Sequence, residues 1–251
     1  MVNNEEPMIE ARNVWKRYHG PFGGDWVLRG LNFTIPRGIS VGIVGKNGAG
    51  KSTLLRMIGG MDAPDKGEII ERCRISWPIG LSGGFQGSMT GRQNVKFVSR
   101  IQGGNKYVDQ IIDEVEQFAE LGKAFDQPIA TYSSGMKSRL AFGLSLAFDF
   151  DVYLSDEATA VGDVTFKRKA TQAFKDRIGR SSIIMVSHQV KILRDLCQAG
   201  IFLHEGKAIW YDKLDDALDA YYESIGQKPN YKKKKNPGRY AQENLIDDDE
   251  D

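Results

Sequence analysis

A glycine-rich turn between two apolar segments limits the folds that this 251-residue sequence can adopt. The run Ser40–Val44 is short and apolar, which is typical of a buried strand. The segment Lys51–Ile58 has the apolar spacing of a helix that ends at Gly59. Between them, Gly45–Thr53 fits the pattern G-x-x-x-x-G-K-[ST], which in this strand-to-helix context predicts a phosphate-binding loop (P-loop).

Each residue type in this loop has a role in holding phosphate. Glycines let the backbone wrap closely around the phosphates, so that its N–H groups and the helix N-terminus point at them. We expect Lys51 to pair with the β- and γ-phosphates and the Ser52 hydroxyl to ligate Mg²⁺. The predicted ATP-binding residues of the loop are Gly45, Asn47, Gly48, Gly50, Lys51, Ser52 and Thr53. The alternative is a strand-to-helix turn that binds no nucleotide.

Two adjacent acids follow a second apolar run. Tyr153-Leu-Ser leads into Asp156 and Glu157, at the predicted end of a strand. In P-loop enzymes the first acid holds Mg²⁺ and a neighbouring group orients the attacking water. We therefore assign Asp156 to the metal and Glu157 to the water, as general base. The alternative is a solvated strand end, but together with the P-loop the pair makes an ATPase or GTPase the leading class.

Composition indicates the class of protein and its compartment, but it does not identify a function. A net charge of +1 argues against a general nucleic-acid binder, which usually has a basic excess. The N-terminus is acidic and polar, unlike a secretory signal, and no apolar run approaches the roughly 20 residues that span a bilayer. Cys73 and Cys197 match no metal-binding spacing, so we expect reduced thiols in a cytosolic protein.

The order of segments predicts an α/β fold. Strands are expected at 9–16, 27–35, 40–44, 152–154 and 183–186, and helices at 51–58, within 90–122, from 134 to 147 and at 166–178. Strands that alternate with helices imply a mainly parallel sheet, here interrupted by a helical lobe at about 88–149. Beyond residue 226 the composition becomes lysine-rich and then acidic, so 227–251 is interpreted as a disordered tail. A lysine cluster at 232–235 leaves contact with anionic lipid as an alternative.

Several further segments, in chain order over residues 8–226, resemble the ATP-binding cassette (ABC) family. Tyr132-Ser-Ser-Gly-Met136 is similar to its signature motif, in which Ser133 and Gly135 hold the key positions. The resemblance implies that these two residues cap the γ-phosphate held by a second subunit; read alone, the segment is better interpreted as a plain helix N-cap. It also implies a P-loop NTPase cassette with a mainly parallel core sheet, an N-terminal antiparallel β subdomain and a helical lobe.

The same resemblance assigns four single residues. Gln86 matches the Q-loop glutamine, which touches Mg²⁺ and water, and His188 matches the switch histidine that contacts the γ-phosphate. Asp163 resembles the D-loop aspartate at the dimer seam. Tyr18 is placed like the aromatic residue that stacks on adenine, with His19 as the competing candidate.

A finer resemblance points to the ATPase subunits of bacterial capsular polysaccharide exporters. It rests on Ile75-Ser-Trp-Pro-Ile-Gly80, Gly84-Phe-Gln-Gly-Ser88, Phe118-Ala-Glu-Leu-Gly122 and Ala160-Val-Gly-Asp163. It implies a homodimer with composite ATP sites, attached to an integral-membrane permease at the cytoplasmic face of the inner membrane, with polysaccharide cargo handled through the permease. Trp77 and Phe85, beside the Q-loop, are expected either to contact that permease or to pack inside the protein.

The alternative interpretations differ either in what is transported and in which direction, or in the class of P-loop protein. The same chemistry would serve an exporter of O-antigen or teichoic acid, or an importer. A soluble cassette ATPase would usually carry tandem cassettes or a long coiled-coil insertion, and a P-loop kinase or GTPase would not need the signature, D-loop and switch histidine in this order. A purely structural nucleotide-binding module would show no turnover despite Glu157.

Overall fold

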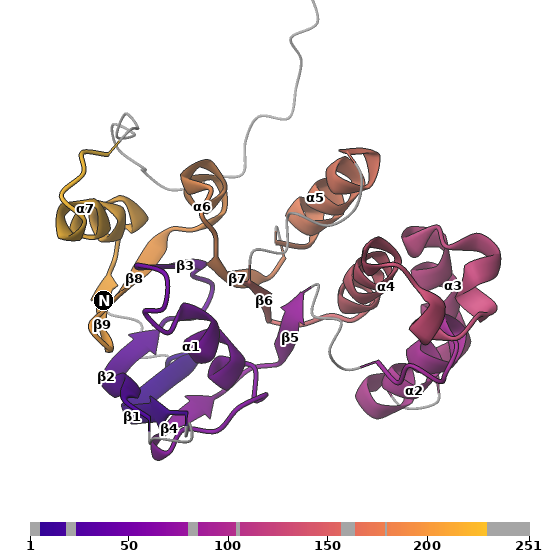
Figure 1. The fold of residues 1–251 in the computed structure, drawn as a ribbon, viewed down its shortest axis with the longest axis horizontal. Helices are drawn as coiled ribbons and strands as arrows, with labels where there is room; N and C mark the ends of the chain where they lie inside the picture. The colour runs from indigo at the N-terminus through magenta and orange to yellow at the C-terminus, as the bar shows by residue number, and fades with distance from the viewer. Residues whose placement is uncertain are drawn as a thin grey trace, which may run out of the picture.

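The computed structural model describes residues 6–18, 24–79, 85–103, 106–156, 164–178 and 180–229. Within them the chain forms two sheets and a separate group of helices (Figure 1). The predicted α/β class, with a mainly parallel core sheet, an antiparallel β subdomain and a helical lobe, is confirmed. Two predicted boundaries remain predictions: the division between cassette and tail at residue 226, and the limits of the helical lobe at about 88–149.

The core sheet has six strands in the order β5-β6-β7-β3-β8-β9. Their bounds are β3 (Val41–Val44), β5 (Ile75–Ile79), β6 (Val152–Asp156), β7 (Ser182–Val186), β8 (Ala199–His204) and β9 (Lys207–Tyr211). Neighbouring strands pair in parallel except for β8 and β9, which form an antiparallel hairpin. The four strands β3, β6, β7 and β8 are almost entirely buried, which explains their mainly apolar sequences.

A smaller antiparallel sheet has the order β2-β1-β4, from β1 (Ile9–Arg17), β2 (Trp26–Ile35) and β4 (Lys66–Glu71). Helix α1 (Lys51–Ile58) lies between the two sheets. Its side chains Leu54 and Leu55 belong to one buried cluster with Ile9 and Leu28 of the small sheet and Ile43 of the core sheet. The helix that begins at the P-loop is therefore fixed by apolar packing on both sides.

Helices α5 (Val164–Ile178), α6 (Val190–Leu196) and α7 (Leu214–Ser224) cover the other face of the core sheet (Figure 1). Their buried side chains Phe166, Leu193 and Leu214 pack in a second cluster that contains Tyr153 and Ile183 of the sheet. Each central strand thus sends alternate side chains into two different cores.

The helical lobe extends to the right in Figure 1. It contains α2 (Gly91–Gly103), α3 (Val108–Ala119) and α4 (Ser134–Leu146), with the short 3₁₀ helices η2 (Gly122–Asp126) and η3 (Ile129–Thr131) between α3 and α4. Trp77, on β5, packs edge-on against Phe148 and Phe150 and donates a 2.8 Å hydrogen bond to the Ser145 hydroxyl. Of its two sequence interpretations, internal packing is the one that the structure supports. Phe85 is half-buried against the same core.

Both cysteines are free thiols. Cys197 is buried, and burial raises the pKa of the half-buried Cys73 thiol to about 11. Neither thiol therefore ionises appreciably near neutral pH.

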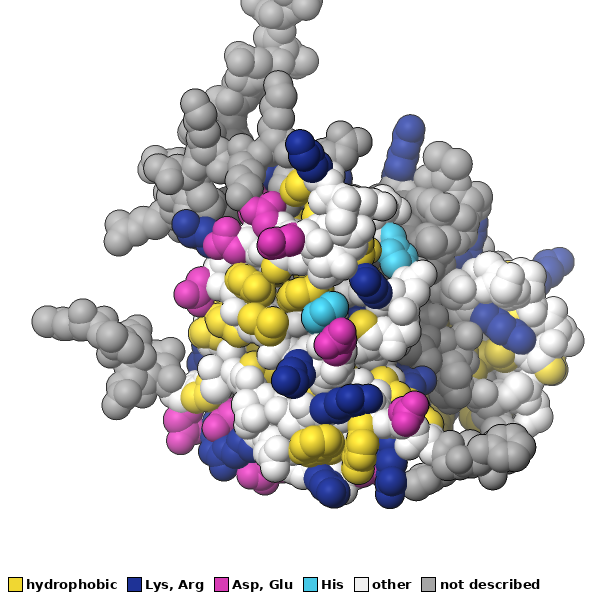
Figure 2. Space-filling model, turned by 60° about the vertical axis from the view of Figure 1, so that its left-hand side comes forward, with side chains coloured by type: hydrophobic (Ala, Val, Ile, Leu, Met, Phe, Trp, Pro, Cys, Tyr) yellow, Lys and Arg dark blue, Asp and Glu magenta, His cyan; other side chains and the backbone are white. Residues whose placement is uncertain are grey.

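Charged side chains are interspersed on the face seen in Figure 2, where lysines and arginines lie among acidic and hydrophobic groups. None of the helices in the described segments has the length and apolar character that crossing a bilayer requires.

Candidate active site

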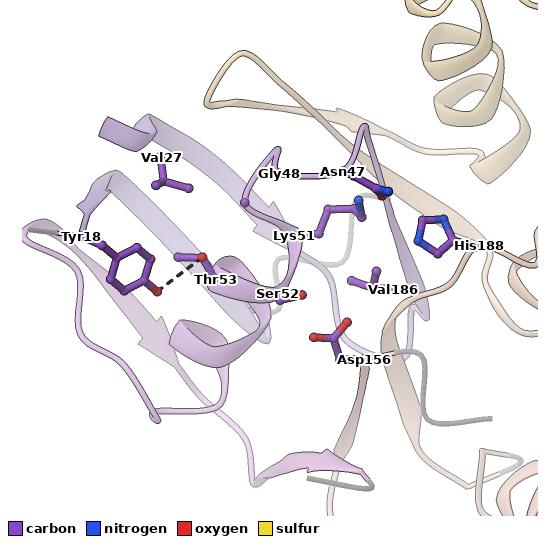
Figure 3. Close-up of a pocket in the computed structure, with 11 residues that line it drawn as sticks. Tyr18, Val27, Asn47, Gly48, Lys51, Ser52, Thr53, Asp156, Val186 and His188 are labelled. Atoms are coloured by element: carbon purple, nitrogen blue, oxygen red, sulfur yellow. Dashed lines mark hydrogen bonds between the residues drawn. The ribbon is translucent and has the colours of Figure 1, made fainter. Parts of the chain in front are cut away.

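Strand order brings the predicted catalytic segments to one edge of the core sheet. Strands β6, β7 and β3 are parallel neighbours, so their carboxyl ends meet at the same edge. Asp156 is the last residue of β6, His188 follows β7, and the P-loop follows β3. Segments more than 100 residues apart in the sequence therefore share one site (Figure 3).

These segments surround a pocket of about 570 Å³. It is lined by Tyr18, Val27, Asn47, Gly48, Gly50, Lys51, Ser52, Thr53, Asp156, Val186 and His188. Figure 3 shows Tyr18 at one end and His188 at the other, with Lys51 and Ser52 between them. A base at the Tyr18 end and phosphates at the Lys51 end would match this elongated arrangement.

The P-loop backbone has the conformation that its glycines permit. Gly50 has φ +97°, and a Cβ atom there would approach Leu28 Cδ2 to 2.7 Å. At Gly45 a Cβ would come within 2.4 Å of the Leu203 carbonyl oxygen. Gly50 is the N-cap residue of α1 and makes no side-chain hydrogen bond. The N–H groups at the start of the helix are therefore not bonded to a capping side chain. These groups are the donors that an anion at a helix N-terminus uses.

Lys51 is folded back along the loop. Its Nζ donates to the Gly45 carbonyl at 2.8 Å and to the Lys46 carbonyl at 2.9 Å. Those bonds hold the ammonium group at the loop, where a phosphate cradled by the backbone would meet a positive charge.

Ser52 and Asp156 supply hydroxyl and carboxylate oxygens to the same pocket. Hard cations prefer oxygen ligands, and Mg²⁺ in nucleotide sites is usually held by one or two protein groups together with phosphates. Within the described segments no three His, Cys, Asp or Glu side chains cluster as a metal site would require. The donor set therefore fits Mg²⁺ bound jointly with a nucleotide.

Tyr18 lies just beyond β1, and its residue surface is 43% exposed. Its hydroxyl donates to Asp62 Oδ2 at 2.9 Å and accepts from Arg56 Nη2 at 2.7 Å. Lys16 Nζ lies 2.7 Å from Asp62 Oδ1. Burial acts to raise the pKa of the Asp62 carboxyl, but hydrogen bonds from Lys16 and Tyr18 outweigh it, so this pKa lies below its ordinary value. Asp62 is therefore a carboxylate at neutral pH.

Gln86 is exposed and does not line the pocket. Its side-chain amide donates to the Ser88 hydroxyl at 3.3 Å. Its main chain is held by the buried Asn94 of α2, whose Oδ1 accepts from the Gln86 N–H at 2.8 Å and whose Nδ2 donates to the Gln86 carbonyl at 3.1 Å. The structure thus connects Gln86 to the helical lobe, not to the P-loop pocket.

The signature segment also lies away from this pocket, on the lobe. Ser133 is the N-cap of α4, and its hydroxyl accepts from the Met136 N–H at 3.2 Å. Gly135 lies in the first turn of the same helix. The N-cap interpretation is therefore correct within one chain. Glu157 and Asp163 lie outside the described residues.

Sequence reasoning missed several residues around the pocket. Val27 and Val186 line it, from the start of β2 and the end of β7. Val186 directly precedes Ser187-His188, and that position was a usable signal. Nothing in the local sequence marks Asp62 as a partner of Tyr18, because 44 residues separate them.

Comparison with known proteins places this chain in a family. Residues 28–160 match the family model described as ABC transporter. The polysialic acid transport ATP-binding protein KpsT of Escherichia coli is 54% identical over 85% of this chain and 96% of its own length. This chain belongs to the ABC transporter family, as one of its ATP-binding cassettes. Its enzymatic class is ATPase.

Two other relatives differ in how much of their length is matched. The capsule polysaccharide export ATP-binding protein CtrD of Neisseria meningitidis is 43% identical over 87% of this chain and 100% of its own length. The O-antigen export system ATP-binding protein RfbB of Myxococcus xanthus is 38% identical over 79% of this chain but only 46% of its own length.

Solved structures agree on the fold. A dimeric post-hydrolysis state of the ATP-binding cassette MJ0796, bound to ADP and Pi, superposes with a TM-score of 0.68 at 24% identity. The match covers 82% of this chain and 99% of that one. At this identity the likeness establishes the cassette fold.

Proposed function

We propose that this cassette powers export of a capsular polysaccharide across the cytoplasmic membrane, as a homodimer attached to a membrane-spanning permease. The observation that carries the proposal is the 54% identity to the polysialic acid transport protein, over 96% of that protein's length. The O-antigen relative is less similar and is matched over less than half of its length. Capsule-type cargo is therefore favoured over O-antigen.

The residues at the pocket have distinct tasks in the proposed reaction. The P-loop N–H groups and Lys51 bind and orient the β- and γ-phosphates, while Tyr18 offers a face to the base. Ser52 and Asp156 would hold Mg²⁺, which would supply positive charge beside the phosphate oxygens. Glu157 accepts a proton from the attacking water, and His188 contacts the γ-phosphate.

The position of Ser133 supports a site shared by two copies. Ser133 and Gly135 begin α4 on the helical lobe and do not line their own chain's pocket. A serine hydroxyl, a glycine backbone and a helix N-terminus together form an anion site. In the proposed dimer they cap the γ-phosphate bound to the other copy, so ATP stabilises the closed dimer and hydrolysis releases it.

In the proposed mechanism, Gln86 belongs to the connection between the helical lobe and the permease. Because Asn94 binds both main-chain groups of Gln86, we expect Gln86 to follow a shift of the first turns of α2. A shift of the helical lobe on ATP binding is thereby passed along the Q-loop to the permease at the membrane.

The test is the location of polysaccharide in source cells whose only copy of the chain carries Glu157→Gln. Polymer retained inside cells with a bare surface is the expected result. Cells with Glu68→Gln, a change at an exposed β4 carboxylate, should keep a normal coat. A normal coat in Glu157→Gln cells would overturn the capsule assignment, and retention of a different surface glycan would assign the cassette to that polymer.

A further inference from the structure

The Tyr18 hydroxyl has more partners than base stacking requires. Stacking uses only the face of an aromatic ring, so a phenylalanine would provide it equally well. Yet the hydroxyl donates to Asp62 at 2.9 Å, accepts from Arg56 at 2.7 Å and lies 3.4 Å from the Thr53 hydroxyl. Hydrogen bonds to charged partners are stronger than neutral ones, so this hydroxyl is firmly held.

Two of these partners belong to the helix that begins at the phosphate cradle. Thr53 and Arg56 both lie on α1, which starts at Lys51 and is packed between the two sheets. The bond from Arg56 therefore ties the ring to the same rigid element that positions Lys51 and Ser52. Figure 3 shows the Tyr18 side chain, which follows the end of β1, directed toward Thr53 of this helix.

Asp62 is itself fixed from a different direction. Its Oδ1 faces Lys16 Nζ at 2.7 Å, while Oδ2 accepts from Tyr18. Lys16 is only 8% exposed and also donates to the Ala63 carbonyl at 2.7 Å. The two carboxylate oxygens thus divide between a buried cation and the tyrosine, which leaves Asp62 little freedom to turn.

The same cations lie near the ring. Lys16 Nζ is 5.4 Å from the Tyr18 ring centroid, and the Arg56 guanidinium carbon is 5.9 Å from it. Both fall within the range over which a cation is attracted to an aromatic face. The ring is consequently restrained at its hydroxyl and by the charges beside it, although 43% of the residue surface is exposed.

We propose that Asp62 is a positioning residue for the nucleotide base: with Arg56 it holds the Tyr18 hydroxyl, and so fixes the stacking ring relative to the phosphate cradle. This inference rests on the proposed stacking role of Tyr18. Asp62 does not touch the nucleotide. It reduces the freedom that the ring would lose when a base stacks on it, and so strengthens binding through preorganisation.

The experiment compares binding of ATP and of tripolyphosphate, which has no base, to the purified full chain. Isothermal titration measures both ligands on the wild type, Tyr18→Phe, Asp62→Ala and the double variant. Tyr18→Phe and Asp62→Ala should each weaken ATP binding about three- to ten-fold, the size expected when a freed side chain must be immobilised on binding. Tripolyphosphate affinity should stay unchanged, and Asp62→Ala should add nothing in the Tyr18→Phe background.

The controls separate positioning from folding. Tyr18→Phe removes only an oxygen and leaves the Lys16–Asp62 pair intact, so it tests the inference even if Asp62→Ala unfolds the chain. Glu68→Ala removes an exposed carboxylate of β4, paired with Arg12 at 3.3 Å, and should bind both ligands like the wild type. Equal weakening of ATP and tripolyphosphate by Asp62→Ala would mean a general structural role and would overturn the inference.

A fifth variant separates this inference from the proposed function. If Tyr18→Ala weakens ATP binding while Tyr18→Phe and Asp62→Ala do not, stacking stands and the positioning role of Asp62 is wrong. If Tyr18→Ala binds ATP as the wild type does, the base does not stack on Tyr18, and both assignments fail together.

Discussion

At the scale of single residues, Gly48 and Gly50 separate two reasons for glycine in the P-loop. Both have left-handed backbone angles, φ +81° and +97°. A Cβ at Gly48 would meet no atom within 4 Å, whereas one at Gly50 would lie 2.7 Å from Leu28 Cδ2 and 3.0 Å from Val27 Cγ1. Gly48 therefore needs only the backbone freedom of glycine, and Gly50 needs the space as well.

This difference predicts unequal effects of alanine on stability. Gly48→Ala should lower the free energy of unfolding by about 1–2 kcal/mol, the cost of a left-handed non-glycine residue. Gly50→Ala should cost about 1–3 kcal/mol more, because α1 or β2 must shift to relieve the contacts. Urea denaturation of the two variants measures the difference. Equal losses would mean that the loop accommodates the extra methyl group freely.

The sequence predicted a residue of the pocket only where that residue belongs to a recognisable motif. One pocket is lined by Tyr18, Asp156, His188 and six of the predicted P-loop residues, whereas the seventh, Gly45, is not among its lining residues. The partners of Tyr18 were not predictable, because Arg56, Asp62 and Lys16 are ordinary charged residues until the fold brings them together. Gln86 belongs to a predicted motif, yet it does not line the pocket of this chain.

At the scale of elements, α4 allows a test that separates capping from catalysis. Ser133→Ala removes the N-cap hydroxyl and should cost about 1 kcal/mol of stability. Ser133→Asp keeps a good capping group but places a negative charge where the proposed dimer holds the γ-phosphate.

Ser133→Asp should therefore match the wild-type melting temperature and lose ATP turnover, measured on the complex with the permease. Ser133→Ala serves as the comparison, with a lower melting temperature. Full turnover in Ser133→Asp would show that the signature segment is only a helix cap.

The apolar signal explains only part of which elements were predicted, because the buried strand β8 was not assigned. Strands β3, β6 and β7 have nearly continuous buried sequences and were placed within one or two residues. Strand β4 was missed because its burial pattern is mostly exposed, as befits an edge strand with a single partner. Helix α7 was not assigned, although Leu214, Ala217 and Leu218 have helical spacing and are buried.

At the scale of the whole molecule, ion pairs give stability a definite pH dependence. The Arg92 guanidinium lowers the pKa of the Asp126 carboxyl by hydrogen bonding. At Asp62, burial is outweighed by hydrogen bonds from Lys16 and Tyr18, and the pKa is again lowered. A carboxyl whose pKa is lowered in the folded state stabilises the fold at pH values above its unfolded-state pKa, which is 3.8 for both groups. This contribution is lost as the pH falls through the lower folded-state pKa.

We therefore expect the free energy of unfolding to fall between pH 4 and pH 3, measured by urea denaturation. Glu71 acts in the opposite direction, because burial raises its pKa and protonation favours its folded state. Asp126→Asn should reduce the slope, since it removes one of the carboxyls whose pKa is lowered in the folded state. A free energy of unfolding that does not change between pH 4 and pH 3 would contradict the assigned pKa directions.

The proposed function requires that ATP bound at the P-loop pocket is hydrolysed with Glu157 as the base. The measurement is ATP binding and ATP turnover by the chain in complex with its permease. Glu157→Gln should bind ATP normally but lose turnover by at least about 100-fold, the contribution of a positioned base. Lys51→Ala should instead weaken ATP binding. Near-normal turnover in Glu157→Gln would contradict the account.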